Sequence, residues 1–97
     1  MKTFPFDTEG LIKICSDNDI VMVGLFGSIA RGEGKENSDI DLLVKFAKRK
    51  SLLGVVKLER ELSEAMGRKV DLVTEAAISP YIRKNVLRDL EIIYAAQ

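Results

Sequence analysis

Two short motifs carry the residues of this chain whose types and spacing are suited to chemistry. Gly27-Ser28 follows an apolar run, and Asp39-Ile40-Asp41 comes after ten intervening residues. A third acid, Asp71, lies within the apolar run 70–73. Carboxylates among apolar residues are costly to bury unless a cation pairs with them. We therefore interpret the three aspartates as ligands of metal ions that bridge the protein to a nucleoside triphosphate.

The spacing of the aspartates suits magnesium. On a strand, Asp39 and Asp41 leave the same face with their bases roughly 6.5–7 Å apart. Mg²⁺ prefers one or two carboxylates combined with waters and substrate phosphates. Two-metal sites place their ions roughly 3.5–4 Å apart, so two Mg²⁺ ions with Asp71 as a third acid are predicted. The alternative is that Asp39 and Asp41 face solvent on a half-exposed strand and that Asp71 is a surface residue of an edge strand.

The Gly27-Ser28 turn is predicted to hold the phosphates of the nucleotide. Glycine lets the backbone turn sharply and approach a ligand closely, and Ser28 offers a hydroxyl and N–H groups to an anion. Arg31 follows one helical turn later and is predicted to meet the triphosphate. The alternatives are an ordinary turn with a serine cap and an exposed arginine beside the acidic loop 33–38.

Composition excludes several kinds of site. The length of 97 residues predicts one domain, 1–97. The sequence contains no histidine, and this absence excludes a Ser-His-Asp triad and a histidine-ligated metal. Cys15 is the one cysteine, so no internal disulfide forms. Fifteen basic and fifteen acidic residues cancel, so any anion binding must be local and general nucleic-acid binding is not predicted. The one dense basic run, over residues 45–50, is typical of a solvated loop. On a strand, however, Lys45 lies on the same face as Asp39 and Asp41, so it is a candidate to approach bound nucleotide.

The location that we expect is the cytoplasm, without membrane association. The uncharged stretch 20–30 is far shorter than the roughly 20 residues that span a bilayer. The N-terminal residues also lack the apolar segment of a secretory signal.

The pattern of apolar residues predicts alternating helices and strands. Period-two and period-3.6 patterns, together with turn residues, define the expected ranges. Helices are expected over 8–17, 51–65 and 80–90, a short helical turn over 28–31, and strands over 20–26, 39–46, 69–74 and 92–95. This order predicts an α/β (α+β) fold with a small mixed sheet flanked by helices.

Taken together, the motifs resemble a known signature. Gly-Ser-Ile-Ala-Arg-Gly at 27–32, followed by Ser-Asp-Ile-Asp-Leu-Leu-Val at 38–44, is similar to the minimal nucleotidyltransferase (MNT) proteins of the DNA polymerase beta-like superfamily. Asp71 matches the third carboxylate of that family. The resemblance implies the polymerase beta-like nucleotidyltransferase fold. It also implies that Asp39, Asp41 and Asp71 are catalytic metal ligands and that Gly27 and Ser28 hold the β- and γ-phosphates.

The same resemblance implies an activity and a partner. The implied reaction transfers AMP from ATP to a hydroxyl, with Mg²⁺ as cofactor. Members of this size are typically antitoxins, so the implied acceptor is a tyrosine of a HEPN toxin. Two alternatives stay open: a binding module that neutralises its partner stoichiometrically, and a transferase that acts on a small molecule or RNA end with another subunit. A homo- or hetero-oligomer is also compatible with the sequence. C-terminal apolar residues such as Ile82 and Ile92 are candidates to dock a partner or to fill the core.

Overall fold

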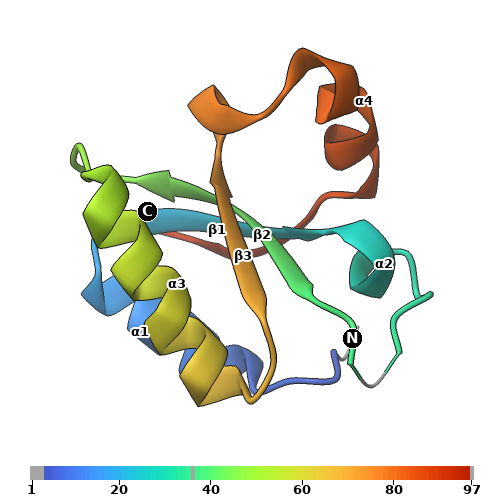
Figure 1. The fold of residues 1–97 in the computed structure, drawn as a ribbon, viewed down its shortest axis with the longest axis horizontal. Helices are drawn as coiled ribbons and strands as arrows, with labels where there is room; N and C mark the ends of the chain where they lie inside the picture. The colour runs from blue at the N-terminus through green and yellow to red at the C-terminus, as the bar shows by residue number, and fades with distance from the viewer. Residues whose placement is uncertain (1–3, 36, 97) are drawn as a thin grey trace.

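The protein is built around a mixed four-stranded sheet. The structure, a computed structural model, describes residues 4–35 and 37–96 (Figure 1). Its strands are β1 (Ile20–Phe26), β2 (Ile40–Phe46), β3 (Val70–Thr74) and β4 (Glu91–Ala95), in the spatial order β3-β2-β1-β4. β1 is antiparallel to β2 and to β4, whereas β2 and β3 are parallel. The predicted mixed sheet is confirmed, with β4 at one edge and β3 at the other.

Helices cover both faces of this sheet. They are α1 (Thr8–Asp17), α2 (Gly27–Ala30), α3 (Leu52–Met66) and α4 (Pro80–Asp89), with a 3₁₀ turn at Glu75–Ala77. Figure 1 shows α1 and α3 side by side at one end of the sheet, and α2 and α4 toward the other. None of the helices in the described part of the chain has the length and apolar character needed to cross a bilayer.

The helix ends follow the signals in the sequence. Asp7 caps α1 by accepting a hydrogen bond from the Gly10 N–H at 3.0 Å, and Ser51 caps α3 by accepting one from the Gly54 N–H at 3.1 Å. Gly67 ends α3 at φ 72°, a left-handed conformation that suits glycine. The predicted bounds coincide with the observed ones at half of the ends and differ by one residue at the other half, because terminal residues make few of the bonds that define an element.

The two faces of β2 enter different parts of the core. Ile40, Leu42 and Val44 pack with residues of α1 and α3 in the larger apolar cluster. Leu43 points the other way and packs with Ile78 and Val86 in a smaller cluster. Asp41 shares the face of Leu43 because side chains alternate along a strand. Asp41 is therefore on the less covered side of the sheet.

The C-terminal apolar residues divide between core and surface. Val86 on α4 is buried, whereas Ile82 and Ile92 are about half exposed. Tyr81 and Leu87 on α4 are also exposed. Val86 therefore belongs to the core, whereas docking of a partner on the exposed residues stays a prediction.

Candidate active site

Strand pairing brings Asp41 and Asp71 together. β2 and β3 run parallel, and Asp41 is the register partner of Asp71. Facing residues on neighbouring strands put their side chains on the same face of a sheet. β3 lies beside β2 in the sheet, and this pairing places two of the three predicted acids side by side.

The crowding of these acids is visible in the electrostatics of Asp41. The pKa of Asp41 is raised from 3.8 to about 6, first by burial and then by the negative charges of Asp71 and Asp39. A hydrogen bond with the Asp71 carboxyl contributes in the same direction, and the Arg31 charge opposes it. Like charges in a partly desolvated site disfavour ionisation. A cation placed between these carboxylates would remove the repulsion.

Asp39 stands at the margin of this pair. It immediately precedes β2 and is exposed. Within residues 4–35 and 37–96, no three acidic or cysteine side chains converge as a ready-made metal site. The donors present are carboxylate oxygens, which suit Mg²⁺, an ion that takes its remaining ligands from water and phosphate. The acids therefore fit a magnesium site that needs substrate to complete it, with Asp41 and Asp71 central and Asp39 at the rim.

Gly27 lies directly against Asp41. Phe26, at the end of β1, is the register partner of Asp41, so the next residue begins α2 beside that carboxylate. Gly27 has φ 80°, and a Cβ at this position would collide with Oδ2 of Asp41. Only glycine combines this backbone conformation with this approach. The start of α2 therefore lies against the Asp41 carboxylate, next to the pair of acids.

Arg31 is held by other protein groups. Its Nε lies 2.9 Å from Oε2 of Glu33, and one of its terminal nitrogens lies 2.8 Å from Oδ2 of Asp89. The second bond joins α2 to the end of α4, and it lowers the pKa of Asp89. The contact with Asp89 was not foreseen, since the two residues are 58 positions apart. The contact of Arg31 with a triphosphate stays a prediction, and it would require Arg31 to leave these partners.

Two side chains of α3 fix the strand that carries Asp71. β3 is an edge strand, and the N–H groups of Val70 and Leu72 point away from β2. Ser63 Oγ accepts the first at 2.9 Å, and Glu59 Oε2 accepts the second at 2.8 Å. Helix periodicity alone does not reveal this role, because Glu59 and Ser63 look like ordinary polar residues of an exposed face. Asp71 is also approached by Lys69 at 3.7 Å, a pair exposed enough to be weak.

Comparison with known proteins gives the family. Residues 9–97 match the family described as Polymerase beta, Nucleotidyltransferase. The chain belongs to this family. It is 46% identical over 72 residues to the protein adenylyltransferase MntA of Thermococcus cleftensis, an alignment that covers 74% of this chain and 71% of the relative. The protein is therefore a nucleotidyltransferase whose relatives are protein adenylyltransferases.

Solved structures of minimal nucleotidyltransferases share the fold. A toxin–antitoxin crystal structure with AMP-PNP superposes with a TM-score of 0.82 at 28% identity, covering 94% of this chain and 75% of the other. A complex of a tri-AMPylated Shewanella oneidensis HEPN toxin with its MNT antitoxin gives 0.73 at 25% identity, covering 93% and 71%. The resemblance drawn from the sequence motifs is confirmed.

Proposed function

We propose that this protein transfers AMP from ATP to a tyrosine hydroxyl of a partner HEPN toxin and so acts as an antitoxin. The observation that carries the proposal is the juxtaposition of Asp41 and Asp71 beside the left-handed Gly27. The match to protein adenylyltransferases supports the type of reaction, and the likeness to a complex with an AMPylated HEPN toxin supports the acceptor. The domain that acts is taken to be the whole of residues 1–97, working in the cytoplasm where ATP is available.

Each residue of the site has a role in this proposal. Gly27 and Ser28 hold the β- and γ-phosphates, and Arg31 approaches the triphosphate after leaving Glu33 or Asp89. Asp39, Asp41 and Asp71 hold magnesium, expected as two ions. Bound there, magnesium would neutralise the charge that develops on the phosphates and on the leaving pyrophosphate.

The transfer is an in-line displacement. The acceptor oxygen forms a bond to the α-phosphorus while the bond from that phosphorus to the bridging oxygen of pyrophosphate breaks. The proton of the acceptor hydroxyl passes to a carboxylate, and Asp71 is the candidate because the site leaves it partly exposed. In such a reaction the protein contributes mainly positioning and electrostatic complementarity.

The test follows a label from ATP to protein. The protein is mixed with Mg²⁺, ATP labelled at the α-phosphate and a HEPN protein from the same genome. We expect label on the toxin, loss of toxic activity, and a labelled tyrosine identified by mass spectrometry. The variant Asp41→Asn should transfer no label, whereas the matched acid-to-amide change Glu64→Gln on the exposed surface of α3 should transfer normally.

Other outcomes point to the alternatives. Full neutralisation of the toxin by Asp41→Asn without any label would identify a stoichiometric binder, an alternative that the open arrangement of the three acids also permits. Label on RNA or on a small molecule in place of the toxin would identify a transferase with a different acceptor. Either result would overturn the proposal.

A further inference from the structure

A pocket lies at the opposite end of β2 from the acids. It has a volume of about 230 Å³, and its floor is formed by Val44, Phe46 and Val55. Lys45 lies four residues beyond Asp41, which places it about 13 Å further along the strand. Lys45 is therefore remote from the acid pair, although the two residues share a face of β2. This pocket is separate from the candidate active site.

Four cations surround the pocket. Lys45, Lys48, Arg49 and Lys50 all line it, in a chain whose net charge is zero. Lys45, Lys48 and Arg49 make no ion pair with a carboxylate anywhere in the described ranges 4–35 and 37–96. Lys50 donates a hydrogen bond to the Asn18 carbonyl at 3.3 Å and lies 5.7 Å from the centre of the Phe46 ring. Unpaired like charges gathered around one opening repel one another, and an anion would relieve that repulsion.

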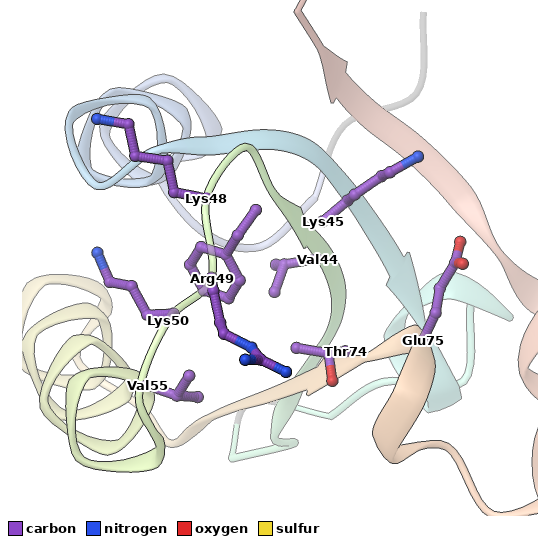
Figure 2. Close-up of a pocket in the computed structure, with 9 residues that line it drawn as sticks. Val44, Lys45, Lys48, Arg49, Lys50, Val55, Thr74 and Glu75 are labelled. Carbon is purple, nitrogen blue, oxygen red and sulfur yellow. The ribbon is translucent and has the colours of Figure 1, made fainter.

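The orientation of the cationic side chains indicates which kind of anion the pocket suits. Figure 2 shows Lys45 and Lys48 extending to opposite sides of the pocket, while Arg49 reaches across it toward Thr74. Lysines that diverge in this way are poorly placed to converge on a single phosphate. They are well placed beside a chain of phosphates that passes over the opening.

The interior of the pocket suits a base. Its apolar lining includes the aromatic ring of Phe46, while Thr74 and the carboxylate of Glu75 also line it, so the cations outnumber the anion by four to one. The volume falls below the roughly 300–1,000 Å³ of pockets for drug-sized ligands, so it accommodates one ring system and leaves phosphates outside. Nucleic-acid sites for single strands combine such a stacking surface with a cationic rim.

We propose that this pocket binds single-stranded nucleic acid, with one base on the apolar floor and the backbone phosphates along Lys45, Lys48 and Arg49. The proposal goes beyond AMP transfer, because it concerns a different part of the sheet and requires no chemistry. It also explains why the basic run is gathered around a cavity instead of lying on a flat surface.

The test uses fluorescence anisotropy with EDTA present, which removes divalent metals from the acid site. The probe is a labelled twelve-nucleotide oligouridylate, compared with an abasic oligomer of the same phosphate count. Stacking of one base contributes roughly 1–3 kcal/mol, so the intact oligomer should bind about fivefold or more tightly than the abasic one. Equal affinity for the two oligomers would show that charge alone attracts them, and it would overturn the proposal.

Variants locate the binding. The double change Lys48→Gln and Arg49→Gln should weaken binding and reduce the slope of log K against log salt by about 1.4, because each phosphate contact to a single strand contributes about 0.7. The matched pair Arg83→Gln and Lys84→Gln, exposed on α4, should leave both quantities unchanged. Equal losses in the two double variants would contradict a site at the pocket. Displacement of the oligomer by oligoglutamate at an equal concentration of charges would indicate an acidic protein segment as the occupant.

Amide chemical shifts provide an independent readout of the same question. Addition of the unlabelled oligomer should shift the amide signals of Phe46, Arg49 and Val55. Shifts restricted to residues around Gly27 and Asp41 would place the oligomer at the acid site and refute the proposal. Mononucleotide AMP should produce clearly smaller shifts at the pocket, since it brings one phosphate to cations that diverge.

Discussion

Replacing Asp41 with asparagine is expected to stabilise the metal-free protein at neutral pH, although it removes a residue proposed to be essential for AMP transfer. Burial and the charges of Asp71 and Asp39 raise the pKa of Asp41 to about 6. The folded protein therefore favours the protonated form of Asp41 relative to the unfolded chain. Asparagine has a similar shape and cannot ionise, so it escapes the repulsion.

The sign and size of the effect follow from linkage. Asp41 imposes no penalty well below pH 3.8, where the carboxyl is protonated in both states; the penalty grows between about pH 3.8 and 6 and is complete above that range. A shift from 3.8 to about 6 is about two pKa units, and each unit corresponds to about 1.4 kcal/mol. Asp41 keeps some contact with water, which screens part of this repulsion, so we expect about 1–2 kcal/mol at pH 7.5. For a chain of this size that raises the Tm by about 5–10 °C.

The assay is thermal unfolding followed by circular dichroism in EDTA at pH 4 and pH 7.5. The Tm difference between Asp41→Asn and wild type should be small at pH 4 and should reach its full value at pH 7.5. Glu64→Gln on α3 controls for the loss of one negative charge. Adding Mg²⁺ with a nonhydrolysable ATP analogue at pH 7.5 should then stabilise the wild type more than the variant. The reasoning is refuted if Asp41→Asn changes the Tm equally at the two pH values.

Two further substitutions probe how the site is held. Gly32→Ala should lower the free energy of unfolding by about 1 kcal/mol, because Gly32 has φ 77° with open space around it. Gly27→Ala should lower it by at least about 1 kcal/mol more, because the added Cβ collides with Asp41. Equal losses of stability in urea titrations of the two variants would show that the contact between Gly27 and Asp41 is unimportant. Glu59→Ala should lower the free energy of unfolding by about 1–3 kcal/mol and speed hydrogen exchange at the Leu72 amide, because it removes the acceptor of that N–H. Glu59→Gln keeps an acceptor and should lose much less stability. Unchanged exchange at Leu72 in the alanine variant would count against the role assigned to Glu59.

The parts of the fold that could be predicted from the sequence are those set by local rules. Alternation along β2 places Leu43 in a different apolar cluster from Ile40 and Leu42, so the period-two pattern of the sequence is enough to separate the two faces of the strand. Ser51 and Gly67 marked the two ends of α3 because capping depends on a few neighbouring atoms. The proximity of Asp41 and Asp71 was also predictable, but only on the condition that their strands pair.

The parts that could not be predicted depend on contacts between distant segments. Nothing local indicates that Arg31 meets Asp89, because that contact exists only once α4 has packed against the sheet. The pairing of Glu59 with the Leu72 N–H likewise needs β3 to be an edge strand that lies against α3. The basic run shows the same limit, since a charged loop and the rim of a pocket have the same composition.

The arrangement along β2 separates the two sites by sign of charge. Asp41 lies near the start of the strand and Lys45 near its end, about 13 Å away by the rise of a strand. Ionic screening acts over about 8 Å at physiological salt. The cations around the pocket therefore do little to neutralise the acids or to repel a cation that binds them. Two cations do approach the acids, since Lys69 lies 3.7 Å from Asp71 and the Arg31 charge acts to lower the pKa of Asp41, but burial and the neighbouring acids outweigh them. The acids at one end of β2 therefore keep a net repulsion that a bound cation would relieve, while the cations at the other end carry a repulsion of the opposite sign that an anion would relieve.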